Sequence, residues 1–598
     1  MRAVTSNGSP HTVARPCRHF TGFPRVDVGY LGTAREREIL VAIKDSAVTL
    51  SHDQWMLPGT PSRDVVMSAP SVRNDRRVLC VFPRYAPSFG TFEHSYPLMP
   101  GVRGFMPPQG ILVIAASMPS AWDVRFIDEN VRRATDDDFA WADAVFVSGM
   151  HIQRAAIDDI NARAHAHGKV TVLGGPSVSG APDYYPEFDY LHVGELGDAT
   201  WQVVEALDAS VARPLSQIRF TTKDRVPLGD FPTPKYESID GRNYFLGSVQ
   251  FSSGCPYRCE FCDIPELYGN NPRLKTPEQV TAELDAMVAA GVQNAVYFVD
   301  DNFVGNRKAA KTLLPHLIAW QKKNGYPLQF ACEATLNIAK SPDLLEMMRE
   351  AYFCTVFCGI ETPDTDALHA ISKDHNNHVS ILDAIKMLND FGMEVVSGII
   401  MGLDTDTPET PKKILDFIDL SHIPLLTINL LQALPRTPLH RRLTAEGRLT
   451  DEPGRESNVV FKLPYEQVLA GWRHAVAIAY EPERLYARFA YQTEHTFPNR
   501  ITPPASKARV NAANIRKGLL TLGNILIRVG VLSNYRRTFW RMARRAVATR
   551  KPETMIELII HIGFVSHHLI TFARQAATGK QNASFYSENV RPQERVAS

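Results

Sequence analysis

Cysteine is scarce in this chain, with eight residues among 598, so a disulfide-held scaffold is excluded. Long hydrophobic runs are missing as well: no stretch of about 18 uncharged apolar residues is present, and no segment is expected to span a membrane. The N-terminus has no apolar core of the kind found in signal peptides. The formal net charge is only +1, which gives no support to nucleic-acid binding. These absences predict a cytoplasmic protein without a nucleic-acid partner.

The rest of the composition is that of an ordinary soluble protein, with 44% apolar and 22% charged residues. A chain of 598 residues is too long for one hydrophobic core. Changes in periodicity and proline content predict five regions. They are a partly disordered N-terminal extension (1–75), a first α/β domain (76–207), a linker (208–243), a second α/β domain (244–440) and a mostly α-helical domain (441–598).

The first α/β region alternates short apolar strands with helices. The expected strands are 78–82, 123–127, 144–148, 170–173 and 190–193, and such a series predicts a parallel, doubly wound (Rossmann-like) sheet. Ser148, Gly174-Gly175 and Gly194-Glu195 fall at strand ends, where such sheets bind their ligands. Glycine there lets a large flat or phosphorylated ligand approach the backbone. A nucleotide cofactor is one candidate, although no G-x-G-x-x-G motif is present.

The second α/β region contains about six strands that alternate with helices. They are expected at 248–252, 295–299, 329–332, 355–359, 394–401 and 426–431. This series predicts a full or partial α/β barrel, whose active site lies at the carboxyl ends of the strands. Polar residues follow several of these strands, among them Asp300-Asp301-Asn302, Glu333 and Glu361.

Three cysteines stand close together after the first of these strands. Residues 255–262 are CPYRCEFC, with the spacing C-x3-C-x2-C. A structural zinc site would need a fourth Cys or His, and the next cysteines, at 332, 354 and 358, lie in apolar strand contexts typical of buried free thiols. The other interpretation is a four-iron cluster on three thiolates, with one iron left open for a ligand.

The spacing, the aromatic Phe261 before the last cysteine, and the position after the first barrel strand resemble the radical S-adenosylmethionine (SAM) superfamily. The resemblance implies that Cys255, Cys259 and Cys262 bind a 4Fe-4S cluster. It also implies that SAM binds the open iron and is cleaved to a 5′-deoxyadenosyl radical. The electron would come from a reductant such as flavodoxin or ferredoxin.

The same resemblance implies contacts to SAM. Asp300-Asp301-Asn302, after the second strand, falls where the SAM amino group is bound, in place of a commoner glycine-rich form. Glu361 falls where a polar residue contacts the ribose. Gly398 and Gly402 match a G-x-I-x-G strand beside the adenine. The alternative for each is an ordinary polar or glycine residue at a strand end.

A doubly wound domain before such a barrel resembles the cobalamin-binding class of the superfamily. The resemblance covers about residues 77–205 and implies that Ser148, Gly174, Gly175, Gly194 and Glu195 surround cobalamin. The D-x-H-x-x-G motif that ligates cobalt is absent, because the first strand ends in Phe-Pro-Arg at 82–84. Histidine ligation of cobalt is therefore not expected, and His151 is interpreted as a loop residue.

Three further stretches, 88–109, 263–275 and 299–306, narrow the resemblance. They are similar to cobalamin-dependent radical SAM enzymes with an extra C-terminal helical domain, a group that includes the hopanoid C-2 methylase family. Membership implies methyl transfer from methylcobalamin to an unactivated carbon of a hydrophobic polycyclic lipid, here C-2 of a hopanoid. The alternatives are another natural product, a radical cyclisation or rearrangement, or a cobalamin-binding sensor with a structural cluster.

The last region carries a basic segment with interleaved aromatic residues. The arginines and lysine are Arg536, Arg537, Arg541, Arg544, Arg545, Arg550 and Lys551. Such a helix can lie at an anionic membrane surface, which predicts peripheral contact with the inner face of the membrane. The alternative is a solvated helix that packs on the barrel. The apolar segment 555–573 carries histidines and a glutamate, and is expected to be a core helix or a lid.

Overall fold

The computed structural model describes residues 71–376, 380–452, 454–504, 512–548, 558–559 and 561–579. The chain divides into two compact units, Met1–Val66 and Met67–Ser598, and all described residues belong to the second. Residues 1–70 of the predicted N-terminal extension (1–75) lie outside the described residues.

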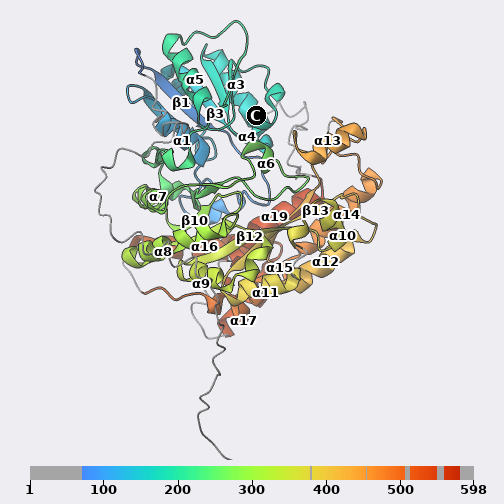
Figure 1. The fold of residues 1–598 in the computed structure, drawn as a ribbon. Coiled ribbons are helices and arrows are strands. Elements are labelled where there is room, and N and C mark those ends of the chain that lie inside the picture. The colour runs from blue at the N-terminus through green and yellow to red at the C-terminus, as the bar shows by residue number, and fades with distance from the viewer. Residues whose placement is uncertain are drawn as a thin grey trace, which may run out of the picture. The chain divides into compact units, whose positions relative to one another are not determined.

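Six parallel strands form the first sheet, in the order β2-β1-β3-β4-β5-β6 (Figure 1). The strands are β1 (Arg77–Phe82), β2 (Asp123–Asp128), β3 (Ala144–Ser148), β4 (Val170–Gly174), β5 (Tyr190–Val193) and β6 (Ile218–Thr221). Alternate residues of β1 enter different cores: Val78 and Cys80 pack on one face, and Leu79 and Val81 on the other. Helices cover both faces, which confirms the doubly wound prediction. They are α1 (Gln109–Ser117), α2 (Asp136–Trp141), α3 (Arg154–Ala166), α4 (Pro176–Gly180) and α5 (Asp198–Ala209).

Strand β6 lies within the segment 208–243 that was predicted to be a linker. It pairs in parallel with β5, from Tyr190 opposite Ile218 to Val193 opposite Thr221. The first sheet therefore continues beyond residue 207. The prediction missed this strand because β6 is at the sheet edge and three of its four residues are exposed, so it lacks the apolar run that marks a buried strand.

The second sheet also has six parallel strands, in the order β14-β13-β12-β11-β10-β7. They are β7 (Gly247–Val249), β10 (Asn294–Phe298), β11 (Leu328–Glu333), β12 (Phe353–Glu361), β13 (Glu394–Met401) and β14 (Leu425–Leu430). The flanking helices are α7 (Pro277–Ala289), α8 (Arg307–Asn324), α9 (Pro342–Glu350), α10 (Thr365–Ala370), α11 (Ile381–Asp390) and α12 (Thr410–Ser421). Because β7 and β14 are the two edges, this is a partial (β/α)6 barrel, as predicted.

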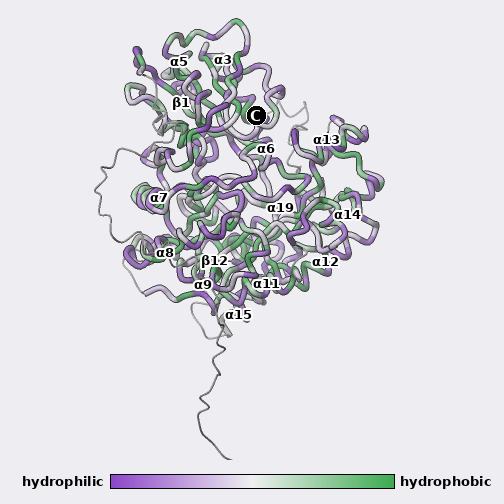
Figure 2. The backbone as a smooth tube through the Cα atoms, in the orientation of Figure 1, coloured by the Kyte–Doolittle hydropathy of each residue, from purple (hydrophilic) through white to green (hydrophobic). Residues whose placement is uncertain are grey.

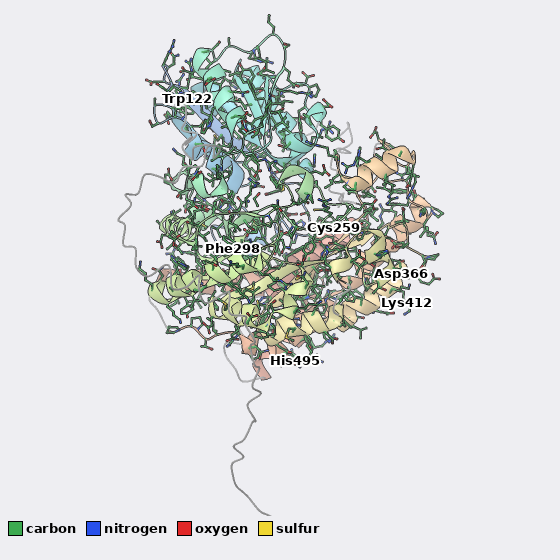
Figure 3. The ribbon with its side chains drawn as sticks, viewed as in Figure 1. Trp122, Cys259, Phe298, Asp366, Lys412 and His495 are labelled. Carbon is green, nitrogen blue, oxygen red and sulfur yellow. The ribbon has the colours of Figure 1, made fainter. Side chains whose placement is uncertain are left out.

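Burial of side chains in this barrel differs between its strands and its outer helices. Phe298 of β10 is fully buried, whereas Asp366 and Lys412 lie on outer helices and are exposed (Figure 3). Figure 2 shows hydrophobic and hydrophilic positions alternating along outer helices such as α8 and α12. Such alternation is expected where a helix buries one face against a sheet.

The strand predicted at 248–252 is interrupted in the structure. Residues 247–249 form β7, whereas β8 (Ser252–Ser253) turns away and pairs antiparallel with β9 (Arg273–Leu274). The interruption occurs where the N–H groups of Phe251 and Ser252 donate to the Asp300 carboxylate at 2.7 and 3.0 Å. A buried side chain thus replaces a neighbouring strand as the hydrogen-bond partner.

The last region is helical, as predicted. Its helices are α13 (Pro438–Ala445), α14 (Tyr465–Ala479), α15 (Pro482–His495), α16 (Ala512–Ile527), α17 (Arg536–Ala548) and α19 (Ser566–Ala577). Trp472, Phe489 and Phe572 are buried in the same hydrophobic core as the barrel strands. The helices therefore fold against the barrel and do not form a separate core.

The described part of the basic segment is α17. Its arginines at 536, 537, 541, 544 and 545 are exposed, whereas Phe539 and Met542 are buried. Arg550 and Lys551 lie outside the described residues. In the apolar segment 555–573, the described residues Leu558, Ile562 and Leu569 are buried in the core, as expected for a core helix. None of the described helices combines the length and apolar character that a bilayer span requires.

Candidate functional site

The three cysteines lie in a loop between β8 and the short helix α6 (Ile264–Leu267), and Cys259 is labelled in Figure 3. All three side chains are half-buried. The Cys255 N–H donates to Gly269 O, and the Cys262 N–H donates to Cys259 O, each at 3.2 Å. Burial raises the pKa of each thiol, and repulsion from neighbouring thiols adds to it for Cys259 and Cys262. Binding to iron would remove that penalty, because the metal stabilises thiolate.

Glycine is required immediately before the first cysteine. Gly254 has φ +97°, and a Cβ there would lie 2.8 Å from Gly269 O. The Gly254 N–H donates to Asp301 Oδ2 at 2.6 Å. The loop is therefore held from the end of β10, the neighbouring strand in the barrel.

Asp300 and Asn302, on either side of Asp301, also lie close to the cysteine loop or to the residues just before it. The Asp300 carboxylate is 1% exposed and accepts hydrogen bonds from Phe251 N, Ser252 N and Ser252 Oγ. Asn302 Nδ2 lies 4.0 Å from Cys255 Sγ, and Asn302 Oδ1 is buried without a partner among the described residues. Asp301 thus binds the backbone of the cysteine loop and Asp300 binds the segment just before it, whereas Asn302 Oδ1 is a buried acceptor that is open to a ligand.

Three carboxylates lie near one another at the ends of β10 and β11. Burial raises the pKa of Asp300 to about 7, that of Asp301 to about 6 and that of Glu333 to about 7. Repulsion among these groups adds to the shift. A cationic ligand would relieve both penalties, so the group fits the positive charge of SAM. Glu333 is additional to the predicted site residues, and its position directly after a strand was the available signal.

Glu361 ends β12 with φ +66° and forms a buried ion pair with Lys373. Their side chains are 10% and 8% exposed. A side chain at position 359 would displace this pair, because a Cβ would lie 2.5 Å from Glu361 Oε1 and 2.7 Å from Lys373 Nζ. Lys373 Nζ also lies 5.5 Å from the centre of the Phe261 ring. The predicted ribose contact, Glu361, is thus already paired with a cation.

Lys373 was not among the predicted site residues. Burial alone would lower the pKa of Lys373, but Glu361 and the thiols of Cys259 and Cys262 raise it overall. A charged ammonium group therefore faces the cysteine loop, where it would stabilise the negative charge of a thiolate-ligated cluster. No local pattern marks this lysine in the sequence, since it lies between helix α10 and the next expected helix.

The two predicted glycines, Gly398 in β13 and Gly402 directly after it, have different surroundings. A Cβ at Gly398 would make ordinary contacts with Thr427 and Phe357 and lie 3.8 Å from Glu361 Oε2. Gly402 has φ +92°, and a Cβ there would lie 2.5 Å from the Phe461 ring. Gly398 thus lies beside Glu361, whereas the conformation of Gly402 and its contact with Phe461 explain that glycine without a ligand.

The predicted residues of the first sheet gather at the carboxyl ends of neighbouring strands. Ser148 at the end of β3 is opposite Gly174 at the end of β4. A Cβ at Gly175, which has φ +94°, would lie 2.6 Å from Ser148 Oγ. The Gly194 N–H donates to Ser179 Oγ at 2.9 Å. Close approach of neighbouring segments thus accounts for glycine at 175 and 194, and the binding of cobalamin at this edge stays a prediction.

His151, interpreted from the sequence as a loop residue, begins a 3-10 helix, His151–Gln153. Its Nδ1 lies 2.9 Å from the Ser177 hydroxyl. Burial is the main cause that lowers the pKa of His151 to about 4, so the ring is neutral. The side chain has a defined hydrogen-bonding role within the first domain.

Glu195 connects the first sheet to the cysteine loop. It forms ion pairs with Arg225 at 2.9 Å and with Arg273 of β9 at 2.7 Å. Arg273 also donates to Ser253 Oγ at 3.0 Å, two residues before Cys255. The carboxylate predicted to contact cobalamin therefore bridges the carboxyl end of β5 and the hairpin that precedes the cysteines.

Comparisons with known proteins agree with this geometry. The sequence-family model of the Radical SAM superfamily matches residues 249–418, and a domain of unknown function (DUF4070) matches residues 437–582. Hopanoid C-2 methylase of Rhodopseudomonas palustris (strain TIE-1) is 58% identical over 525 residues, which cover 88% of this chain and 99% of that protein.

Two solved structures share the fold at low sequence identity. The radical SAM methyltransferase TsrM from Kitasatospora setae, with cobalamin and a 4Fe-4S cluster bound, is 15% identical with a TM-score of 0.53, over 80% of this chain and 100% of that one. The cobalamin-dependent radical SAM enzyme OxsB, with aqua-cobalamin and SAM bound, is 13% identical with a TM-score of 0.51. The match covers 86% of this chain and 83% of OxsB. Together with the 58% identity above, these findings establish that the chain belongs to the hopanoid C-2 methylase family and is a radical SAM methyltransferase.

Proposed function

We propose that this enzyme methylates C-2 of a hopanoid lipid, with a 4Fe-4S cluster, SAM and cobalamin as cofactors. The observation that carries the proposal is the 58% identity to hopanoid C-2 methylase over 99% of that protein's length. When bound, the cluster and SAM supply the radical chemistry and cobalamin supplies the methyl group. A reductant such as flavodoxin or ferredoxin provides the electron.

The protein's own residues hold and orient these groups. Cys255, Cys259 and Cys262 would ligate the cluster, and Asn302 Oδ1 offers an acceptor beside Cys255. The carboxyl ends of β3, β4 and β5 would bind cobalamin, at Ser148, Gly174, Gly175, Gly194 and Glu195. The exposed arginines of α17 suit peripheral contact with an anionic membrane, where a hopanoid is available.

The function is tested by lipid analysis. A hopanoid-producing host that gains this gene should accumulate 2-methylated hopanoids, and the purified enzyme should transfer label from methyl-labelled SAM to a hopanoid. The Cys259→Ala enzyme is the control for both assays. If the purified enzyme cleaves SAM but no hopanoid gains a methyl group, the lipid substrate is wrong and another natural product becomes the alternative.

Glu195 is expected to couple cobalamin to the radical site. In Glu195→Ala, Arg273 loses its carboxylate partner, and the first sheet loses a direct tie to the cysteine loop. A misplacement of about 1 Å can cost a reaction about 100-fold. We therefore expect methyl transfer to fall by about that factor, while SAM cleavage per enzyme stays near the wild-type rate.

The matched control for Glu195 is Asp183→Ala, which breaks an ion pair with Arg219 on the surface of the same domain. It should leave both rates unchanged. Equal losses of SAM cleavage and methyl transfer in Glu195→Ala would contradict the coupling role, because they would indicate general damage to the cysteine loop.

SAM binding is expected to weaken as the pH falls through 7 to 6. The pKa of Glu333 is about 7 and that of Asp301 about 6. Above these values the carboxylates are charged and attract the sulfonium cation, whereas below them they are neutral. Equilibrium dialysis of SAM from about pH 5 to about pH 9 measures this dependence.

Glu333→Gln should flatten the pH profile and weaken SAM binding above pH 7, since one of the three carboxylates becomes permanently neutral. Glu350→Gln, at an exposed position at the end of α9, should retain the wild-type profile. A wild-type affinity that is constant from pH 6 to pH 8 would rule out this contribution of the carboxylates.

A further inference from the structure

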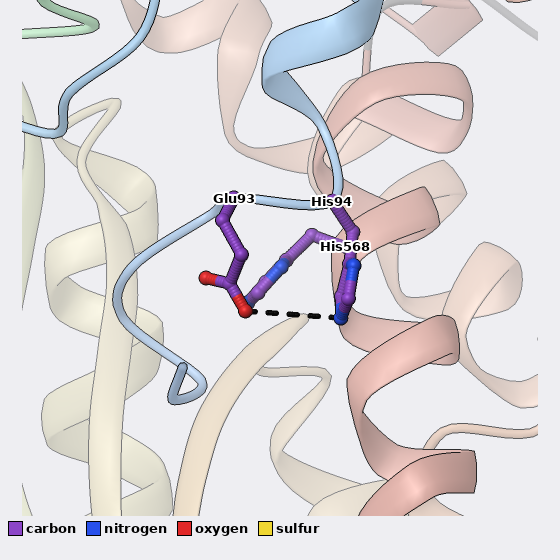
Figure 4. Close-up of side chains that lie close together, drawn as sticks. All are labelled: Glu93, His94 and His568. Atoms are coloured by element: carbon purple, nitrogen blue, oxygen red, sulfur yellow. Dashed lines mark ion pairs between the residues drawn. The ribbon is translucent and has the colours of Figure 1, made fainter. Parts of the chain in front are cut away.

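Glu93, His94 and His568 lie together (Figure 4). The first two belong to the loop between β1 and α1, and His568 belongs to α19. One ligand atom from each residue lies within 4.8 Å of the other two. Two imidazoles and a carboxylate are a common ligand set for zinc and other divalent transition metals.

His568 is the most constrained member of the group. It is 0% exposed, and its Nε2 lies 2.9 Å from Ser88 O, so this nitrogen carries the proton and donates it. Its Nδ1 is buried without a hydrogen-bond partner among the described residues. Burial is the main cause that lowers the pKa of His568 to about 3. The ring is therefore neutral, with a buried lone pair that lacks a donor.

The other two side chains are held by outer partners. The Thr91 hydroxyl donates to Glu93 Oε2, while Glu93 Oε1 is buried without a hydrogen-bond partner and lies 3.7 Å from His94 Nε2. Gln575 Oε1 lies 3.0 Å from the same His94 nitrogen. The Thr91 contact orients Glu93 as second contacts typically orient metal-binding carboxylates. Because Gln575 Oε1 accepts, His94 Nε2 carries the proton in this arrangement, and it binds a metal only in the other tautomer, with Gln575 as a neighbouring ligand.

We propose that Glu93, His94 and His568 bind a divalent transition metal ion, best matched by Zn²⁺, with Gln575 Oε1 or water in the fourth position. Zinc holds nitrogen and oxygen ligands at about 2.0–2.2 Å, so neighbouring ligand atoms lie roughly 3.5 Å apart. The group must contract slightly from its present span of up to 4.8 Å. Glu93 and His94 can move, because their side chains are each 24% exposed and they belong to a loop.

The site is beside the amino end of β7, the first edge strand of the barrel sheet. The Phe92 ring lies 5.2 Å from the His568 ring and 5.7 Å from the Phe245 ring. Phe245 is two residues before β7. The cysteine loop follows β8, beyond the opposite end of β7, so the metal would not take part in the radical chemistry.

The same loop also contacts the other edge strand. Phe89 stacks on Tyr480 with ring centres 5.2 Å apart, and the Tyr480 hydroxyl donates to Leu426 O in β14. The Phe89 ring also packs against Phe572 of α19, with ring centres 4.6 Å apart. The loop between β1 and α1 thus contacts residues near both edge strands of the partial barrel. A metal that links this loop to α19 would therefore hold it in place against both edges. Its role would be to stabilise the barrel at the amino ends of its strands.

The test measures zinc as an element in the purified, cluster-containing full chain after dialysis. We expect one bound equivalent in the wild type, and its loss in Glu93→Gln and His94→Gln. Gln575→Ala removes the candidate fourth ligand, which water can replace, and should weaken zinc binding by less than Glu93→Gln or His94→Gln. His567→Gln is the matched control, because it removes the neighbouring imidazole of α19, which pairs with Tyr535 Oη.

Cys259→Ala serves as a second control and should retain the zinc, which excludes binding by the cysteine loop. A chelator should lower the melting temperature of the wild type and of His567→Gln, but not that of His94→Gln. The proposal is overturned if the wild type retains no zinc, if Glu93→Gln and His94→Gln retain it, or if Cys259→Ala alone removes it. Because Glu93 and His94 are partly exposed, their variants remain informative even if His568→Gln does not fold.

Discussion

Replacing Cys259 by alanine is expected to abolish SAM cleavage while the chain still folds. The change removes one of three thiolates, and two thiolates cannot hold the cluster with one iron open to SAM. The side chain is only half-buried, so the truncation leaves no large internal cavity. The measurement is 5′-deoxyadenosine formation after anaerobic reconstitution with iron, sulfide and cobalamin, followed by SAM and a reductant.

Cys80→Ala is the matched control for this loss. Cys80 is fully buried in β1 of the first sheet, and it makes no contribution to the cysteine loop. Its replacement should lower the melting temperature slightly and leave iron content and SAM cleavage unchanged. Full iron content and normal 5′-deoxyadenosine formation in Cys259→Ala would contradict the assignment of this thiol as a ligand.

Lys373→Met is expected to destabilise the fold by about 3–5 kcal/mol, the usual cost of leaving one buried charge without its partner. The partner is Glu361, whose side chain is 10% exposed. Methionine has a similar length but cannot neutralise the carboxylate. The free energy of unfolding, from urea titration of the protein without its cofactors, measures the effect.

The double variant Lys373→Met/Glu361→Gln should recover most of this loss, because neither side chain is then charged. Lys412→Met is the surface control. It breaks an ion pair with Asp416 on α12, where the side chains are 77% and 58% exposed, and should leave stability nearly unchanged. If the single and double variants are equally unstable, lost packing and not the unpaired carboxylate is the cause.

Features that depend on neighbours in the chain were predictable from the sequence. Strand–helix alternation gave both sheets, because buried parallel strands need apolar residues and short connections. The capping box of α7 is likewise a contact between near neighbours in the chain: Thr276 accepts from Gln279 N and the Gln279 side chain accepts from Thr276 N. The spacing of Cys255, Cys259 and Cys262 likewise lies within eight residues. It was therefore the strongest indication of the chemistry.

The roles of the strand-end residues could not be derived this way. Asp300, Asp301 and Glu195 were predicted to face cofactors, and the structure adds a role that the sequence did not indicate: their hydrogen bonds and ion pairs hold the cysteine loop and the residues just before it. Which atom such a carboxylate contacts depends on the path of a distant segment. The β6 edge strand was missed for a related reason: its pairing with β5 is a tertiary contact that leaves little mark on an exposed sequence.

The order of residues was sufficient to predict the α/β and helical regions, the three-thiol motif and, through family resemblance, the class of reaction. Only the tertiary structure paired Lys373 with Glu361, joined Glu195 to Arg273, and brought Glu93 and His94 against His568. The last contact spans more than 470 residues, as the 480-residue separation of Ser88 and His568 illustrates. Local periodicity reports which face of an element is buried, whereas the identity of its partner is decided when the elements pack.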